Sequence, residues 1–431
     1  MRVILDGVFN HASRGFWPFN HVLENGAASP YRDWFLLDPD VLAGRRGLKA
    51  YPGRDEVEAI TRQRAVDEAM AADGRQGQLR SVSERVLGYQ AWWDLPALPK
   101  LNHANPDVRE YLFGVAQRWL RFGIDGWRLD VPQEIDERGF WEEFRRRCRA
   151  VNPEAYLVGE IWQPAPEWLS GDRFDALMNY PLAEAILSFV GGPRLDMPLV
   201  GQAVELGRHV HAIDGPGFAR QLRTSMSTYP PETTSVQLNL LDSHDTPRFI
   251  SMAGGDASAM RLGAMVQMTL PGAPCLYYGD EVGLPGRHDP DCRRGYPWDP
   301  ARQDGRLRDF YRGLIALRRS EPVLRRGRFE VLCAQGSVVA YALFNDDSLD
   351  LSAAGTGEAG HDVVIVAVNA GDAPIRLECN RADLAGYLAE PVSWTGRGWG
   401  SEFASGPLDH GTFAIELGSR EGAVIGARPA L

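Results

Sequence analysis

The stretch NPDVREYLFGVAQRWLRFGIDGWRLD, residues 105–130, decides the fold class of this chain. It opens with an Asn-Pro pair that suits a helix start and continues at helical spacing through Tyr111 and Trp119 as far as Gly123. A short apolar strand follows and ends in Asp130. Residues 140–160 repeat this order, and their apolar strand ends in Glu160. Two successive helix–strand units predict parallel strands that deliver both carboxylates to one edge of a sheet.

The composition sets broad limits on the partners of the chain. Of its 431 residues, 44% are hydrophobic and 24% are charged, which is typical of a large soluble enzyme. The formal net charge of −11 argues against a nucleic acid partner, because phosphate binding needs a basic face. No apolar run of about eighteen residues is present, so we expect no membrane partner. The cysteines form no CxxC pair, which favours a reducing compartment and argues against zinc: Cys148, Cys275, Cys292, Cys333 and Cys379.

The remaining sequence predicts two domains. Helices and strands alternate from residue 105 to about residue 319, with further strands at Ala176–Met178, Val236–Leu241 and Ala273–Tyr278. Polar or acidic residues follow each of them, as at the carboxyl ends of barrel strands. We therefore predict an α/β barrel over residues 1–327, with residues 12–95 as an inserted subdomain. Residues 328–431 change to a period of two and predict a C-terminal antiparallel β-sandwich, with strands at 338–343, 363–369, 375–378 and 412–417.

The spacing of the two acids favours a particular chemistry. Neighbouring strands lie about 4.8 Å apart. Retaining glycosidases hold their two carboxyl groups about 5–5.5 Å apart, whereas inverting enzymes need room for a water molecule. Asp130 and Glu160 on adjacent strands therefore favour retention. Arg128 points to the same side of its strand as Asp130 and can keep that carboxylate ionised, although a purely structural salt bridge is the alternative.

Four motifs occur in order along the chain: LDGVFNH (5–11), GWRLD (126–130), VGEIW (158–162) and LLDSHDT (240–246). Together they resemble the four signature regions of the α-amylase family of glycoside hydrolases, family 13. LPKLN (98–102) resembles the short signature of the neopullulanase, cyclomaltodextrinase and maltogenic amylase group. GAPCLYYGDE (272–281) is similar to the family's eighth-strand motif. The resemblance implies a TIM-type (β/α)8 barrel with a C-terminal antiparallel β-domain.

The resemblance also implies three catalytic carboxyl groups. Asp130 would be the nucleophile that forms a covalent glucosyl ester. Glu160 would be the acid that protonates the leaving oxygen and then the base that activates water, which requires a raised pKa. Asp245 would bind sugar hydroxyl groups more tightly in the transition state than in the ground state.

Five further residues would contact or orient the substrate. His11 and His244 would form hydrogen bonds to the same sugar, and Arg128 would orient the nucleophile. Glu134 and Trp162 fall where the family shapes the leaving-group side, and a packing role is an equal alternative for each. The motifs imply no metal ligand among these residues.

The expected substrates are cyclodextrins, maltooligosaccharides or pullulan, cleaved at α-1,4 and, as an option, α-1,6 bonds. The alternatives are an α-glucanotransferase that uses the same triad, or an inactive, truncated or non-catalytic homologue. Asn10 stands where family members often bind calcium, but the acidic residues that complete such a site are not evident. We therefore expect no required cofactor and keep Ca2+ open.

The start of the sequence differs from the family pattern. The strand that carries Asp6 corresponds to the third of the eight barrel strands, so the first two βα units and any N-terminal domain precede the positions present here. We expect from this a truncated or misassigned start at Met1. A homodimer, which this group often forms through its N-terminal domain, is in doubt for the same reason. The expected location is the cytoplasm.

Overall fold

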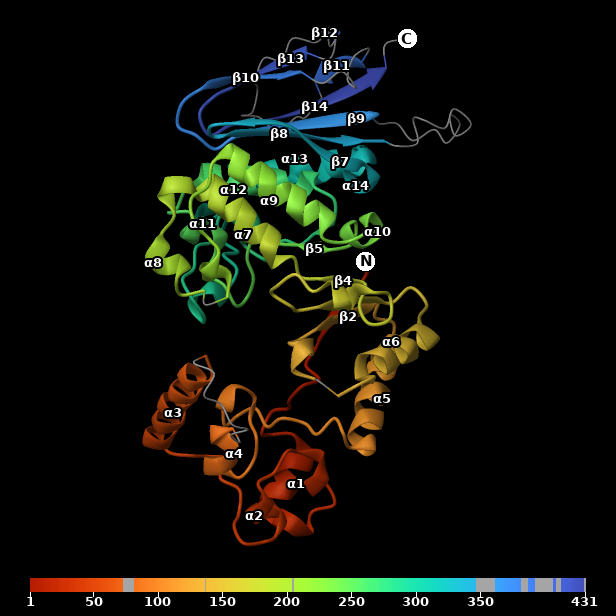
Figure 1. Cartoon of the computed structure of the whole chain (residues 1–431), viewed down its shortest axis with the longest axis vertical. Coiled ribbons are helices and arrows are strands. Elements are labelled where there is room, and N and C mark those ends of the chain that lie inside the picture. Colours follow the sequence, from red (N-terminus) through yellow and green to blue (C-terminus); the bar gives the residue numbers. More distant parts are fainter. Residues whose placement is uncertain are drawn as a thin grey trace. The chain divides into compact units, whose positions relative to one another are not determined.

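The computed structural model describes residues 1–72, 81–135, 137–203, 205–345, 361–380, 387–391, 406–407 and 412–429. The chain forms two compact units (Figure 1). The first contains Met1–Ile161 and Glu167–Asp175, and the second contains Trp162–Pro166 and Ala176–Leu431. No helix within the described residues has both the length and the apolar character that crossing a bilayer requires.

Three parallel strands form the sheet of the first unit: β1 (Ile4–Gly7), β2 (Gly126–Leu129) and β3 (Tyr156–Gly159). The last residues of the three strands pair in register, so all of them end at the same edge. Asp130 and Glu160 are the next residues after β2 and β3. The prediction of parallel strands that carry both acids to one edge is therefore confirmed.

The close approach of β2 and β3 depends on one glycine. A Cβ atom on Gly126 would lie 2.0 Å from the carbonyl oxygen of Tyr156, a distance that no side chain tolerates. Glycine at this position therefore lets β3 pair with β2 and brings the two acids onto neighbouring strands.

Helix α5 (Pro106–Phe122) begins where the sequence predicts, because the Asn105 side chain accepts hydrogen bonds from the first-turn backbone N–H groups. It ends at Gly123, whose φ of 115° is unfavourable for other residues. Tyr111 and Trp119 are 44% and 41% exposed. The buried face of α5 instead consists of Val108, Leu112, Phe113, Ala116 and Leu120. The helix packs against α6 (Phe140–Val151), and Phe113 and Phe140 contact each other with their ring centroids 5.1 Å apart.

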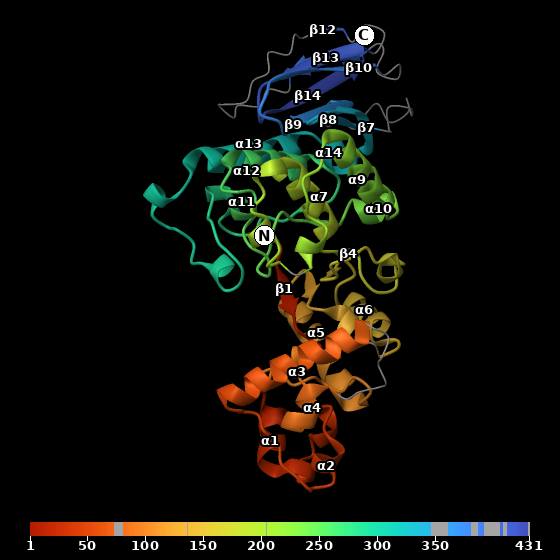
Figure 2. The same ribbon diagram turned by 60° about the vertical axis from the view of Figure 1, so that its left-hand side comes forward.

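The described residues of the segment between β1 and α5 include the α-helices drawn red to orange in Figures 1 and 2: α1 (Trp17–Asn25), α2 (Pro39–Leu42), α3 (Arg54–Ala72) and α4 (Val82–Leu87). Isolated antiparallel bridges join His11 to Lys100 and Phe35 to Leu101, so the two ends of the segment lie together. Helices α3 and α4 lie on either side of residues 73–80, which are outside the described residues.

The second unit begins with three very short strands: β4 (Ala176–Leu177), β5 (Leu238–Asn239) and β6 (Ala273–Pro274). Met178 pairs in parallel with Leu238, and β5 pairs in parallel with β6. The strands are shorter than predicted, but their order and direction agree with βα units. The α-helices among the described residues of this unit are α7 (Tyr180–Gly191), α8 (Met197–Val200), α9 (Gly215–Ser227), α10 (Pro231–Thr234), α11 (Phe249–Met252), α12 (Ala257–Thr269), α13 (Gly305–Ser320) and α14 (Val323–Arg326).

Antiparallel strands follow from Arg328 onward. One sheet has the order β12-β11-β14-β9-β8-β7, and β10 pairs with β13 in another. Figures 1 and 2 show helix α9 beside β7 and β8, which it contacts. The bounds of the strands are β7 Arg328–Gln335, β8 Val338–Phe344, β9 Val363–Asn369, β10 Ile375–Asn380, β11 Tyr387–Pro391, β12 Gly406–Pro407, β13 Thr412–Leu417 and β14 Gly422–Pro429.

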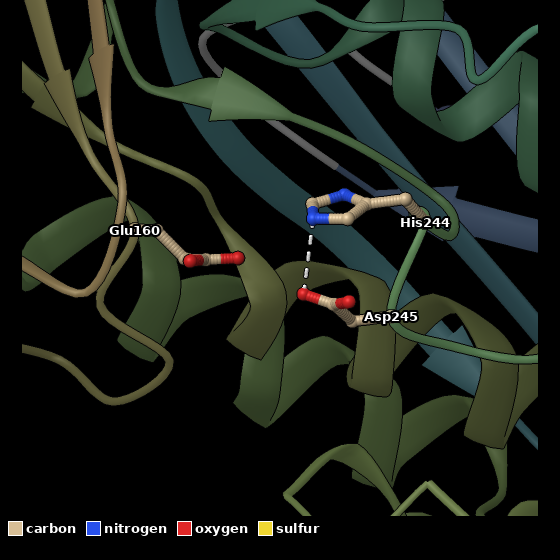
Figure 3. A group of neighbouring side chains, drawn as sticks. All are labelled: Glu160, His244 and Asp245. Atoms are coloured by element: carbon tan, nitrogen blue, oxygen red, sulfur yellow. Dashed lines mark ion pairs between the residues drawn. The ribbon is translucent and has the colours of Figure 1, made fainter. Parts of the chain in front are cut away.

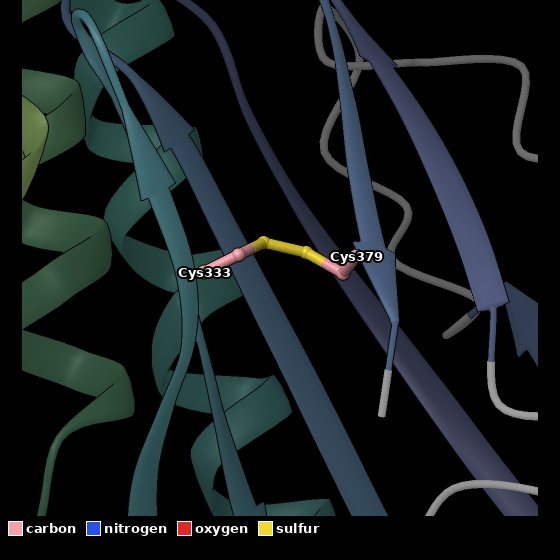
Figure 4. Close-up of a disulfide and its surroundings, with 2 residues drawn as sticks. All are labelled: Cys333 and Cys379. Atoms are coloured by element: carbon pink, nitrogen blue, oxygen red, sulfur yellow. A yellow bond between two sulfur atoms is a disulfide. The ribbon is translucent and has the colours of Figure 1, made fainter. Parts of the chain in front are cut away.

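A disulfide joins the two sheets of this region. It links Cys333 on β7 to Cys379 on β10, with Cα atoms 6.0 Å apart (Figure 4). The cysteine spacing gave no indication of this pair. A reducing compartment predicts reduced cysteines, and the disulfide departs from that expectation.

Candidate active site

Arg128 holds the carboxylates of the first unit together. Its guanidinium donates hydrogen bonds to Asp6 at 2.8 Å and to Asp130 at 3.0 Å, and it forms an ion pair with Glu160. Burial alone would lower the pKa of Arg128, but Glu160, Asp6 and Asp130 more than offset it, so the pKa lies above its usual value. A permanently charged group thus stands between the proposed nucleophile and the proposed acid.

The burial of the three carboxylates differs strongly. The side chain of Glu160 is 2% exposed and that of Asp130 is 17% exposed, whereas that of Asp6 is 57% exposed. The Glu160 backbone N–H donates to the Leu129 carbonyl at 2.9 Å, which extends the pairing of β2 and β3 to the acids themselves. Burial disfavours a charged Glu160, and Arg128 stabilises the charge. The two effects oppose each other at the group that must exchange a proton.

His11 lies at the same edge, and its ring stacks on Trp92 with the centroids 4.7 Å apart. Burial lowers the pKa of His11, an effect that Asp130 partly counteracts and Lys100 reinforces. A neutral His11 can both donate and accept a hydrogen bond, as contact with sugar hydroxyl groups requires. Trp92 was not identified from the sequence, although it lies shortly before the LPKLN motif.

His244 and Asp245 form a pair in the second unit. The His244 Nε2 atom lies 3.1 Å from Asp245 Oδ2, the ion pair drawn as a dashed line in Figure 3. Arg293 donates to the other carboxylate oxygen, Oδ1, at 3.0 Å and to the His244 carbonyl at 2.9 Å. The Asp245 backbone N–H donates to the Ser243 hydroxyl at 3.2 Å. Both oxygens of Asp245 are therefore held by side chains.

A buried acid pair lies beside this loop in the same unit. Burial raises the pKa of Asp242 to about 6, against the influence of Arg248. Burial and the nearby Asp242 raise the pKa of Asp280 well above its usual value. Arg248 is fully buried and donates to the carbonyl groups of Tyr278 at 2.6 Å and Cys292 at 2.8 Å. The pair and the arginine connect the loops that follow β5 and β6.

Glu134 and Trp162 have partners that suit packing as well as binding. Glu134 lies 3.6 Å from the Lys100 ammonium group. Trp162 stacks on Tyr180, with ring centroids 3.7 Å apart and planes 10° from parallel. Because Tyr180 is itself fully buried, it fixes the orientation of the Trp162 ring.

Among the described residues, the surroundings of Asn10 lack the acidic ligand group that would complete a calcium site. Its Oδ1 atom is buried without a hydrogen-bond partner, and its Nδ2 atom lies 3.2 Å from His11 Nδ1. Calcium takes about six to eight oxygen ligands. The described residues place no group of three acidic or histidine ligands around Asn10. No step of the chemistry below uses a metal ion.

Comparison with known proteins agrees with the motifs. Residues 1–312 match the model of the alpha amylase catalytic domain. The chain belongs to the alpha-amylase family. This membership confirms the predicted TIM-type barrel class with a C-terminal antiparallel β-domain.

The similar proteins of the alpha-amylase family include a cyclomaltodextrinase and a neopullulanase. A cyclomaltodextrinase from Bacillus sp is 38% identical over 397 residues, which are 92% of this chain and 58% of the relative. Neopullulanase 2 from Thermoactinomyces vulgaris is 37% identical over 79% of this chain and 49% of its own length. The chain thus spans about half the length of these relatives. The structure of Ttha1563 from Thermus thermophilus has a TM-score of 0.80 and 37% identity, over 99% of this chain and 77% of that one.

Proposed function

We propose that this chain hydrolyses α-1,4-glucosidic bonds, and α-1,6 bonds where they occur, in cyclodextrins, maltooligosaccharides or pullulan, with retention of configuration. One observation carries the proposal. Asp130 and Glu160 follow paired strands in register and share the guanidinium of Arg128. Adjacent carboxyl groups suit the retaining mechanism, because direct attack by one of them needs no water between them.

In the first step, an Asp130 oxygen attacks the anomeric carbon as its bond to the leaving oxygen breaks. The leaving oxygen takes the bond electrons and a proton from Glu160, and a glucosyl ester remains on Asp130. In the second step, Glu160 takes a proton from water, the hydroxide oxygen bonds to the anomeric carbon, and Asp130 is released. Arg128 contacts Asp130 Oδ1, which leaves Oδ2 for the attack.

The family motifs assign His11, His244 and Asp245 to the sugar at which this reaction occurs, and Glu134 and Trp162 to the leaving-group side. The hydrogen bonds from the sugar hydroxyl groups to Asp245 strengthen when these groups become more acidic in the oxocarbenium-like transition state. The cytoplasm is the proposed location, supported by a 33% identical intracellular maltogenic amylase from Bacillus subtilis. The disulfide between Cys333 and Cys379 opposes this location.

The test is hydrolysis of β-cyclodextrin, pullulan and maltotriose, with the anomeric form of the first product followed by proton NMR. We expect α-anomers to appear first, and Asp130→Asn to lose at least about 10⁴-fold in turnover, as loss of a nucleophile does. β-anomers, or activity that Asp130→Asn leaves unchanged, would refute the mechanism. An α-glucanotransferase would instead give mainly longer oligosaccharides at high acceptor concentration.

A further inference from the structure

We infer that Arg293 is a positioning residue that sets Asp245 in its working orientation before substrate binds. The inference rests on the proposed function, because it concerns the carboxylate assigned to the transition state. Arg293 reaches Asp245 Oδ1 at 3.0 Å through one terminal nitrogen and the His244 carbonyl at 2.9 Å through Nε. One planar guanidinium thus binds both the Asp245 side chain and the backbone of His244.

Arg293 is itself held in place from two directions. Its Nε atom lies 2.7 Å from Asp289 Oδ1, four residues earlier. The preceding residue, Cys292, donates from its thiol to the His244 carbonyl at 3.2 Å and accepts a hydrogen bond from the fully buried Arg248 at its own carbonyl. The loop that carries Arg293 is therefore anchored to the protein interior, so the guanidinium is not a freely rotating surface group.

The contact orients the carboxylate. Arg293 engages Oδ1 through a single nitrogen, and the His244 ring faces Oδ2. The guanidinium fixes the plane of the carboxylate, so that its oxygens point in set directions when the sugar hydroxyl groups arrive.

The side chains of Arg293 and Asp245 are 45% and 37% exposed, so the ion pair contributes little to folding stability. Its effect is expected in catalysis. The adjacent Arg294 supplies a matched control, because its guanidinium pairs with Asp291, at 2.7 and 2.9 Å.

The test compares Arg293→Met and Arg293→Ala with Arg294→Met on maltotriose. We expect Arg293→Met to lower kcat about 10- to 100-fold with a smaller change in KM, because the contacts of Asp245 strengthen in the transition state. Added guanidinium should restore part of the activity of Arg293→Ala, and Arg294→Met should stay within about twofold of wild type. A rise in KM alone, or equal losses in both methionine variants, would overturn the inference.

A second readout needs no activity and separates this inference from the proposed function. Removal of the Arg293 charge should raise the pKa of His244, measured by NMR titration of its ring, because His244 would keep Asp245 but lose the nearby cation. Arg294→Met should leave that titration in place. An unmoved His244 titration in Arg293→Met would show that Arg293 does not govern the pair, even in an active enzyme. A shifted titration in a protein that hydrolyses no glucan would leave the positioning intact and refute the proposed function.

Discussion

Replacement of Arg128 by glutamine tests how the first unit stabilises its acids. The substitution removes the charge that Asp130, Glu160 and Asp6 share. Glu160 and Asp130 are largely buried, and loss of one partner from a buried ion pair costs about 3–5 kcal/mol, because the remaining charge is left uncompensated. Asp6 is more than half exposed, so its share is only about 0.2–1 kcal/mol.

The matched control is therefore Asp6→Asn, which removes the exposed partner only. In urea unfolding at pH 7, Arg128→Gln should lower the free energy of unfolding by about 3–5 kcal/mol and Asp6→Asn by less than about 1 kcal/mol. Equal stability costs in the two variants would refute this reasoning.

Three further predictions concern other parts of the chain. The raised pKa values of Asp242 and Asp280 mean that the folded state binds more protons than the unfolded state, so their contribution to stability is full below about pH 4 and is lost as the pH rises through about 6. Asp280→Asn should therefore flatten the decline in the free energy of unfolding, measured with urea, between pH 5 and 8. An unchanged slope would contradict the assignment of this decline to the Asp242–Asp280 pair. Denatured protein without reductant should show three titratable thiols, and replacement of Cys333 and Cys379 by serine should lower the free energy of unfolding by about 2–4 kcal/mol. Five thiols would show that the disulfide is absent, whereas three would contradict the proposed cytoplasmic location. Dialysis against EDTA should leave hydrolysis unchanged, because the described residues place no group of three acidic or histidine ligands around Asn10. Activity that returns only with added Ca2+ would contradict this expectation.

The sequence was most informative where a local pattern determines the structure. The Asn-Pro start, the closing glycine and the apolar strand set helix α5 and strand β2 at the predicted residues, because capping and strand patterning are local effects. Helical spacing alone could not separate the buried face of α5 from Tyr111 and Trp119, since their exposure depends on what packs against the helix.

Some residues of the candidate site could be identified from local motifs and others could not. Motifs identified Asp130, Glu160 and Asp245, but Arg293 lies outside them, in the charged run HDPDCRR at 288–294. Its role depends on a tertiary contact that spans 48 residues of sequence, and a charged loop ordinarily indicates solvent exposure. The disulfide was missed for a related reason, because cysteine spacing does not show which strands of two sheets face each other.

The central claim is that Asp130 forms a covalent bond to the sugar. Incubation with 5-fluoro-α-D-glucosyl fluoride, which should form the ester faster than water removes it, followed by peptide mass spectrometry, tests this claim directly. We expect one added fluoroglucosyl group, located on Asp130 and absent in Asp130→Asn. A label on any other residue, or full turnover of natural substrate with the β-anomer as first product and no label, would contradict the account.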